Sequence, residues 1–374
     1  MNTFLMAHAE SIYQNKNNQK ILNPFSFHVD PMERLLLVNF ESNPDVIYKG
    51  FEPQYFDDDI HGKGLLVIGW KNDMKVDVYY EKGLKIKAET YDIAGKGLNQ
   101  MIEREFESAV FNILDEGVHA DIVFDDILGR KVEIRIFEKH PKKREPFGLL
   151  APMGDAAESP SAMPLVYVHD FYFVRRKHTD FQIKISGKHL KPDKFPIPLD
   201  GTWMYFARYS ADPFIVTFNS AIDGKLETLD SFKNRLVTDG NTKLEISPNG
   251  PAMEIKKMTN KTSKHEVILD FEPAFPQVNL LKGTVEVSGK FSVKGHSSTG
   301  RIDGDYKIQK NNKKIRILLE PTEGWIPNEN KLTVRFLYAV VKTFKNWPKT
   351  YRWIADLEEF NGSWEMKSDW ERLK

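Results

Sequence analysis

The chain contains no cysteine, and this absence removes several kinds of chemistry at once. Disulfide scaffolds, thiolate metal sites and cysteine nucleophiles all need a thiol group. A chain without cysteine fits a reducing compartment, and we expect a cytoplasmic protein. The first twenty residues, MNTFLMAHAESIYQNKNNQK, lack the basic start and the sustained apolar core of a signal peptide.

Long apolar runs and an excess of charge of one sign are also missing. No stretch approaches the roughly 20 apolar residues that a membrane-spanning helix needs, so we expect no membrane span. The 53 basic residues balance 53 acidic ones, so no global field attracts nucleic acid or an anionic membrane. We therefore expect no nucleic-acid partner, and any charged partner must be recognised locally. Nothing in the sequence indicates the oligomeric state.

Motifs for nucleotides and metals are missing along the chain. No Gly-Lys pair is followed by Ser or Thr, so there is no phosphate-binding P-loop, and no dinucleotide fingerprint occurs. The ten histidines show no His-x-His, His-x-x-x-His or His-Glu-x-x-His spacing, so a zinc site would have to be assembled from remote positions. We predict no metal and no cofactor. Two polar stretches, 57–61 and 295–300, are interpreted as a solvated turn and a hairpin loop.

Alternation of apolar and polar residues is the dominant pattern that is present. In the segment 284–294 the apolar side chains fall on odd positions, at Val285, Val287, Phe291 and Val293. Because successive side chains of a strand point to opposite faces, this segment is predicted to be a strand with one buried face. Similar runs predict antiparallel hairpins over 74–88, 120–136 and 306–319, and Asn361-Gly362 predicts a further hairpin turn.

The spacing of these runs predicts the fold class. Strands recur about every 8 to 12 residues, which is typical of antiparallel sandwiches and up-and-down barrels. Helices are expected to be few and short. The segment 95–107 is one candidate, and the spacing of Leu337, Val340 and Phe344 before Pro348 indicates another, although 332–340 is equally compatible with a strand. We therefore predict a mainly β protein built from antiparallel barrel-like or sandwich-like domains.

Two segments rich in proline or small residues divide the chain. With 374 residues the chain is long for one ordinary core, so two domains are expected. The segment 191–201 contains three prolines, which disfavour a continuous strand, and it lies near the middle of the chain. We place the domain boundary there, giving domains at 1–195 and 196–374. The loop 148–164 is expected to cover a cavity mouth, although these two roles can be exchanged.

The segment 165–178, LVYVHDFYFVRRKH, carries the candidate site residues. In an extended strand one face presents Tyr167, His169, Phe171, Phe173 and Arg175, and the other presents Asp170, Tyr172 and Arg176. Neither face is polar enough for free solvent contact, so both are expected to be covered. The adjacent His-Asp pair points to opposite faces and cannot form one catalytic dyad.

Two interpretations of this strand remain open. In the first, His169 and Asp170 each pair across the sheet with a basic residue. In the second, one face lines a ligand cavity, where His169 and Arg175 meet a polar head and Tyr167, Phe171 and Phe173 cover an apolar body. The alternative face would use Asp170, Tyr172 and Arg176. A second aromatic run presents Trp203, Tyr205 and Tyr209 on one face, which suits either core packing or the same cavity.

Two consecutive β-rich halves joined by long connections resemble the bipartite calycin proteins, of the AttH and hydroxyneurosporene synthase type. The resemblance rests on architecture and on strands such as 283–295 and 300–309. It implies two lipocalin-like domains and a hydrophobic or isoprenoid-like ligand within or between them. Hydration or isomerisation chemistry is implied for some relatives, and no family residue can be carried over to this chain.

The sequence therefore predicts a protein that binds a small apolar or amphipathic ligand, either lipid-like or isoprenoid-like, in a cavity within or between two β domains. Two alternatives stay open. One is a hydratase-like or isomerase-like enzyme that acts on such a ligand, with His169 or Asp170 as general acid or base. The other is a structural or interaction protein without a ligand.

Overall fold

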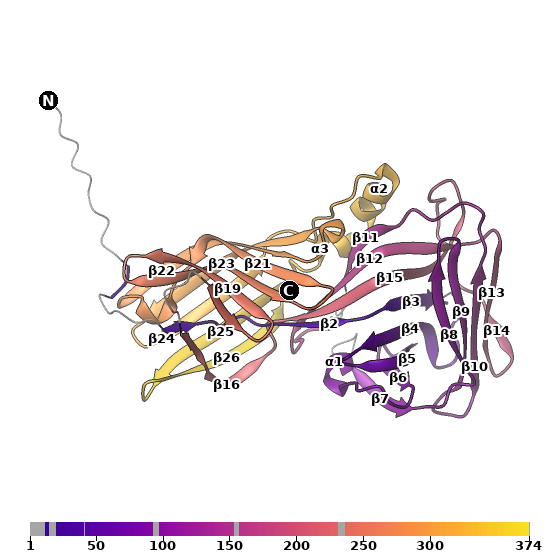
Figure 1. Ribbon diagram of the computed structural model, residues 1–374, viewed down its shortest axis with the longest axis horizontal. Helices are drawn as coiled ribbons and strands as arrows, with labels where there is room; N and C mark the ends of the chain where they lie inside the picture. Colours follow the sequence, from indigo (N-terminus) through magenta and orange to yellow (C-terminus); the bar gives the residue numbers. More distant parts are fainter. Residues whose placement is uncertain are drawn as a thin grey trace.

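Figure 1 shows the protein as a computed structural model in which most of the chain is β-strand. The structure describes residues 12–14, 20–40, 42–92, 97–152, 157–230 and 236–373. Parts of the expected N-terminal domain, including residues 1–11, and residues 153–156 of the expected loop lie outside this range. The predicted mainly β fold class is confirmed for the described residues.

The C-terminal part of the chain forms one ten-stranded antiparallel sheet. In sheet order its strands are β16 (Ile222–Leu226), β26 (Ser363–Arg372), β25 (Tyr351–Phe360), β24 (Lys314–Pro321), β23 (Arg301–Asn311), β22 (Thr284–Lys294), β21 (Glu266–Phe275), β20 (Ala252–Lys261), β19 (Thr242–Asn249) and β18 (Leu236–Asp239). The bounds of β22 coincide with the strand predicted from alternation. The predicted hairpin turn at Asn361-Gly362 joins β25 and β26, so this prediction is also confirmed.

The N-terminal part of the chain supplies two further sheets. A nine-stranded sheet contains, in order, β11 (Phe147–Ala151), β12 (Met163–Arg175), β15 (Met204–Phe218), β3 (Arg34–Asn39), β4 (Tyr48–Asp58), β5 (Gly62–Lys71), β6 (Val76–Tyr80) and β7 (Leu98–Glu103), with β2 (Phe27–Pro31) also paired to β15. A five-stranded sheet contains β14 (Lys188–Leu190), β13 (Thr179–Ile185), β10 (Lys131–Glu138), β9 (Gly117–Asp125) and β8 (Ser108–Leu114). The predicted 120–136 hairpin is confirmed as β9 and β10.

Short elements complete the described part of the chain. β1 (Lys20–Leu22) pairs with β17 (Thr228–Asp230), and the helical segments are α1 (Ala88–Asp92), η1 (Val278–Leu280), η2 (Ser297–Thr299), α2 (Leu332–Val340) and α3 (Lys342–Asn346). Among the described residues, no helix has the length and apolar character needed to cross a membrane. The ambiguity at 332–340 is resolved in favour of a helix.

Two local predictions are wrong. The expected helix at 95–107 is replaced, over its described residues, by β7, which pairs in parallel with β6. The second strand expected in the 74–88 hairpin is also absent, because the chain continues as a loop into α1 after the turn at Gly83. β7 pairs with the otherwise open edge of β6, whereas the segment after Gly83 donates a hydrogen bond from the Lys85 N-H to the backbone oxygen of His61.

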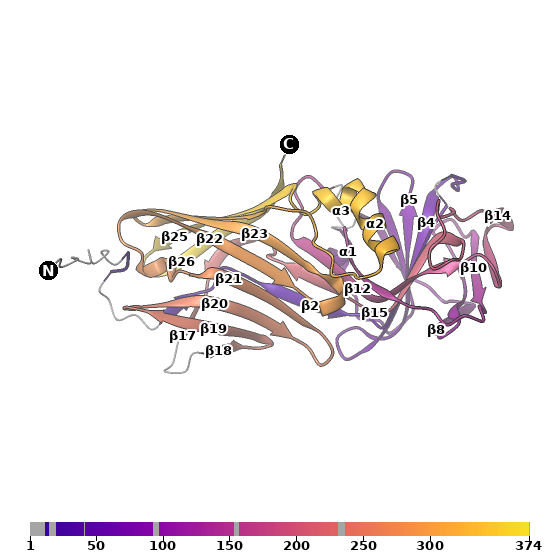
Figure 2. The same ribbon diagram turned by 90° about the horizontal axis from the view of Figure 1, so that it is seen from above.

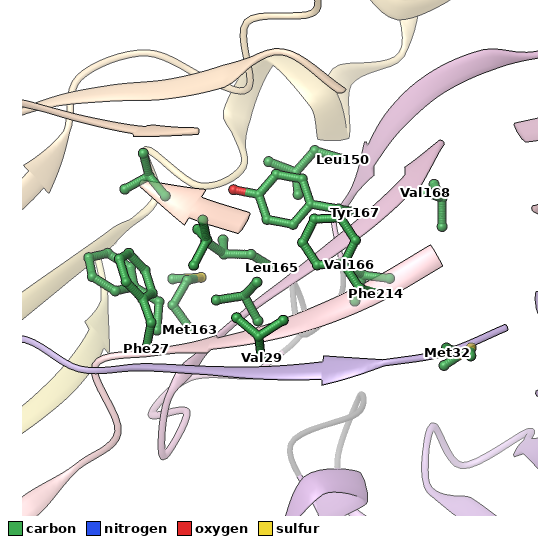
Figure 3. Packing of buried hydrophobic residues seen from close by; sticks show 14 of the residues in the cluster. Phe27, Val29, Met32, Leu150, Met163, Leu165, Val166, Tyr167, Val168 and Phe214 are labelled. Atoms are coloured by element: carbon green, nitrogen blue, oxygen red, sulfur yellow. The ribbon is translucent and has the colours of Figure 1, made fainter. Parts of the chain in front are cut away.

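The long strand β15 ties residues beyond the expected boundary to the N-terminal sheets. It pairs with β12 along most of its length and with β2 and β3 on its other side. The chain therefore passes from the nine-stranded sheet to the ten-stranded sheet between Phe218 and Ile222. The domain boundary at residue 195 stays a prediction. Figure 2 shows loops of the ten-stranded sheet reaching β12 and β15. Figure 3 shows Tyr167 and Phe214 stacked within the buried cluster at this junction, with ring centroids 4.9 Å apart.

Candidate metal centre

Three side chains with metal-ligating atoms meet where β12 and β15 face the turn that precedes β21. His169 lies on β12 and Asp212 on β15, and the two are direct cross-strand partners. His265 ends the turn between β20 and β21, where its backbone N-H donates to the hydroxyl of Thr262. The ligand atoms of the three side chains all lie within 4.8 Å of one another. The sheet register supplies one pair, and the contact between the two parts of the chain supplies the third residue.

Both imidazoles direct Nε2 at the same carboxylate. His169 Nε2 lies 3.4 Å from Asp212 Oδ2, and His265 Nε2 lies 3.4 Å from Asp212 Oδ1. Each of these Nε2 atoms is buried and has no hydrogen-bond partner among the described residues. Two ligand atoms about 2.05 Å from one tetrahedral ion are about 3.3 Å apart. Both nitrogen–oxygen distances are close to this value, and all three ligand atoms lie within 4.8 Å of one another.

Aromatic neighbours hold the two rings in place. The His265 ring stacks on Phe214, with centroids 4.3 Å apart and an interplanar angle of 16°. The His169 ring stacks on His296, with centroids 4.0 Å apart and an angle of 9°. Because each imidazole lies flat against another ring, packing restrains the plane of each His ring.

Burial keeps both imidazoles neutral. The His169 side chain is 13% exposed and the His265 side chain 3% exposed, whereas Asp212 is 42% exposed. Burial, and then the charge of His296, lowers the pKa of His169 to about 4, despite the opposing effect of Asp212. Burial also lowers the pKa of His265. Near pH 7 the centre therefore consists of two neutral imidazoles and a partly solvated carboxylate, which are metal-ligating forms.

The loop that carries His296 fits closely against the N-terminal strands. A Cβ on Gly295 would lie 2.6 Å from the Tyr167 ring, and one on Gly148 would lie 2.1 Å from the backbone oxygen of Ser298. The Nδ1 atom of His296 accepts a hydrogen bond from the Ser298 backbone at 3.2 Å. The predicted hairpin loop at 295–300 is confirmed between β22 and β23, and its contacts bring His296 onto His169.

Replacement of Gly295 with alanine tests this close approach. The Tyr167 ring is fully buried and stacked on Phe214, so it has no room to move away from a new methyl group. We expect Gly295→Ala to destabilise the protein by about 1–3 kcal/mol in urea unfolding. Gly224→Ala is the matched control, because a Cβ there meets nothing within 4 Å. Equal stability of the two variants would contradict the close packing of this loop.

Comparisons with models of protein families, with curated proteins and with solved structures found no match.

The aromatic residues predicted to line a cavity with His169 lie in packed surroundings. Tyr167, Phe171 and Phe173 are all buried. Tyr167 stacks on Phe214, whereas Phe171 contacts Phe173 and Phe147. Of these three residues, Tyr167 packs next to the centre: it stacks on Phe214, and the Phe214 ring also stacks on His265.

Arg175 does not join His169. The pairing of β12 with β15 shifts register between Phe173 and Arg175. This shift brings the guanidinium over the ring of Tyr172, 5.0 Å from its centroid, although strict alternation assigns these residues to opposite faces. Arg175 is 1% exposed, its Nε lies 3.7 Å from Glu138 Oε1, and its Nη1 donates to the backbone oxygen of Lys142 at 2.7 Å. It belongs to a buried ion pair with Glu138.

The other predicted residues are distributed around the N-terminal sheets. Asp170, which has a positive φ of 50°, pairs with both terminal nitrogens of Arg144. Tyr172 donates to Asp200 at 3.2 Å, and the Arg176 backbone N-H donates to the oxygen of Trp203. Of the second aromatic run, Trp203 is 53% exposed, Tyr205 contacts Phe181, and Tyr209 donates to Glu138.

Sequence reasoning found one member of the centre and missed three residues around it. His169 was a candidate, whereas Asp212, His265 and His296 were not. The prediction of no metal rested on the lack of short histidine spacings, and these residues come from β12, β15 and two separate loops. The sequence contained one relevant indication: without short histidine spacings, any metal site must combine ligands from remote positions. Only tertiary contacts identify which remote residues meet.

Proposed function

We propose that this chain binds a divalent transition-metal ion through His169, Asp212 and His265. One observation carries the proposal: two buried Nε2 atoms without hydrogen-bond partners among the described residues lie 3.4 Å from different oxygens of one carboxylate. Leaving buried polar atoms unpaired costs about 1–3 kcal/mol each. Coordination of one ion by both nitrogens and the carboxylate satisfies all of these groups together.

The ligand set indicates the class of metal. Imidazole suits zinc, copper, iron and nickel, and two histidines with one carboxylate are found in catalytic zinc sites and in non-haem iron(II) sites. Three protein ligands leave a coordination position open, and the 42% exposure of Asp212 gives solvent access on its side. An ion held here can bind water or polarise a substrate oxygen. The proposal is therefore a reactive centre rather than a closed structural one.

The competing interpretation treats the three residues as ion pairs. A carboxylate between two charged imidazoles is an ordinary structural arrangement, and it requires protonated histidines. The lowered pKa values of His169 and His265 argue against that charge state near pH 7. A neutral imidazole beside the carboxylate gains little from Coulomb attraction, whereas its free nitrogen is available to a metal.

Cobalt(II) and zinc titrations test the proposal. We expect one ion per chain, a cobalt absorption spectrum typical of four or five ligands, and displacement of cobalt by zinc. Asp212→Asn keeps the shape of the side chain and removes its charge, so it should weaken binding at least tenfold. Asp223→Asn is a matched control because Asp223 is an exposed aspartate of the other sheet. Failure of the wild-type protein to bind either ion at micromolar concentration would refute the metal centre.

The lowered pKa values predict an unusual pH dependence of metal affinity. Protons and metal ions compete for the imidazole nitrogens, and two histidines of ordinary pKa would weaken binding about tenfold between pH 7.5 and 6. Because the pKa of His169 is about 4 and that of His265 is also lowered, we expect less than about a threefold change over this range and a steep loss below pH 5. Calorimetric titration at several pH values checks this. A tenfold loss by pH 6 would contradict it.

A second candidate function is the binding of an apolar ligand. The resemblance to two lipocalin-like domains, which stays a proposal, implies such a ligand. A cavity of about 40 Å³ supports it, with Met32, Leu35, Ile68, Val166 and Ile215 among its lining residues. Glu52 also lines this cavity, burial raises its pKa, and Gln54 and Trp70 donate to its carboxyl group. At about 40 Å³ the cavity holds only a molecule of a few non-hydrogen atoms, far below the roughly 300–1,000 Å³ of ordinary ligand pockets, so a lipid-like ligand would have to widen it.

Native mass spectrometry tests the ligand proposal. Freshly purified protein should carry a bound mass, and Val166→Trp, which fills the cavity, should remove it. Absence of a bound mass in repeated wild-type preparations would count against this function and would leave the metal proposal untouched.

A further inference from the structure

Helix α2 has apolar side chains on two opposite faces. One face packs inward: Val334 and Tyr338 are buried, and the Tyr338 hydroxyl donates to the backbone oxygen of Gly148 at 2.7 Å. The Tyr338 ring also lies 4.7 Å from the ring of Trp325. These contacts attach the helix to β11 and to the segment that precedes it, so its orientation is determined by the fold.

The opposite face of α2 is exposed and is also apolar. Leu332 is 78% exposed, Phe336 is 59% exposed and Val340 is 53% exposed. The three residues are four positions apart, so they form one stripe along the helix. Single exposed apolar residues are normal, whereas an aligned set of large ones indicates an interaction surface.

Exposed cations are concentrated in α2, α3 and the residues that follow, although Glu323 and Glu329 line a surface hollow together with Arg335, Lys345 and Lys349. Arg335, Lys342, Lys345 and Lys349 are all exposed, and none forms an ion pair with another residue that the structure describes. No Asp or Glu occurs between Glu329 and Asp356 in the sequence. In a chain with a net charge of zero, this is a local concentration of positive charge next to an apolar stripe.

The position of the helices leaves this surface accessible. Figure 1 shows α2 projecting from the edge of the molecule, beyond the strands that it covers, and α3 follows it directly. Figure 2, turned by 90°, also shows both helices on the outside. An extended flat partner can therefore reach the stripe and the cations together.

We propose that α2 and α3 dock on the surface of an anionic lipid bilayer. Leu332, Phe336 and Val340 would enter the boundary between headgroups and acyl chains, while the neighbouring lysines and Arg335 contact anionic headgroups. A second copy of this chain fits less well, because a symmetric contact would bring two sets of cations together. Nucleic acid would pair with the cations and leave the apolar stripe in water. The lipid surface matches both features.

Vesicle sedimentation tests this inference. The wild-type protein should pellet with vesicles of phosphatidylcholine containing one third phosphatidylserine, and at least tenfold less with phosphatidylcholine alone. Phe336→Asp should reduce binding at least tenfold, and so should the pair Lys342→Glu and Lys345→Glu. Raising the salt concentration should weaken binding, since salt screens the contribution of the cations.

Phe360→Asp is the matched control, because Phe360 is 62% exposed at the β25–β26 turn, away from the helices. It should bind vesicles as the wild type does, and circular dichroism should show all variants folded. Equal binding by wild type and Phe336→Asp would overturn the inference, as would no wild-type binding. Concentration-dependent dimers that Phe336→Asp abolishes, without vesicle binding, would assign the stripe to a second copy instead. Removal of metal with a chelator should leave vesicle binding unchanged, which separates this result from the metal proposal.

Discussion

Replacing His265 with alanine should weaken zinc binding by at least a hundredfold, the largest effect that we expect from a single substitution on binding. His265 is the most buried of the three ligands, and only its side chain comes from the ten-stranded part of the chain. Without it, His169 and Asp212 remain as a two-ligand site, and such sites hold first-row ions weakly. Isothermal calorimetry of the wild type and the variant measures the difference.

Three comparisons make this result specific. His189→Ala removes an exposed histidine of β14 and should leave zinc affinity unchanged. His296→Ala removes the ring stacked on His169, so we expect a smaller loss, within about tenfold, from poorer orientation of that ligand. Zinc should raise the unfolding temperature of wild type and His189→Ala, and leave that of His265→Ala unchanged. Zinc binding by His265→Ala with wild-type affinity would refute the assignment of this ligand.

Replacing Arg175 with alanine should destabilise the protein by about 3–5 kcal/mol, because the buried Glu138 carboxylate then loses its cation. Glu138 also accepts hydrogen bonds from the Arg175 backbone and from Tyr209, but neither of these groups carries a compensating charge. The backbone oxygen of Lys142 would lose its donor as well. Urea unfolding monitored by fluorescence gives the free energy of unfolding.

The cost of this substitution should depend on pH in a definite direction. Burial raises the pKa of Glu138 to about 7, so the folded protein binds a proton there at pH values where the unfolded chain has released it. Stability from a raised pKa is lost as the pH increases from about 4.5 through about 7. Arg175→Ala should therefore be less harmful at pH 5 than at pH 8.

A double variant separates charge burial from packing. Arg175→Met combined with Glu138→Leu removes both charges and keeps apolar volume, so it should recover most of the stability. If Arg175→Ala were stable but unable to bind an apolar anion, Arg175 would instead be the ligand-binding residue that the strand pattern also permits.

Particular residues show which parts of the fold can be predicted from the sequence. Alternation identified β22 and the hairpin of β9 and β10, because side-chain period is a local property of a strand with one buried face. The same rule misplaced Arg175, because a register shift after Phe173 changes which residues share a face. The prediction of a helix at 95–107 is wrong for a related reason. The segment pairs with the open edge of β6, and this long-range pairing is not contained in local helix propensity.

The sequence by itself determined the mainly β class, several strands such as β22 and the β9–β10 hairpin, and the lack of thiol chemistry. Only the tertiary structure decided that His169 meets Asp212 and His265, and that α2 exposes its apolar stripe. The physical reason is the range of the interactions. Side-chain alternation and turn chemistry act between near neighbours, whereas a metal centre is formed by sheet register and by contacts between distant segments, which no short spacing encodes.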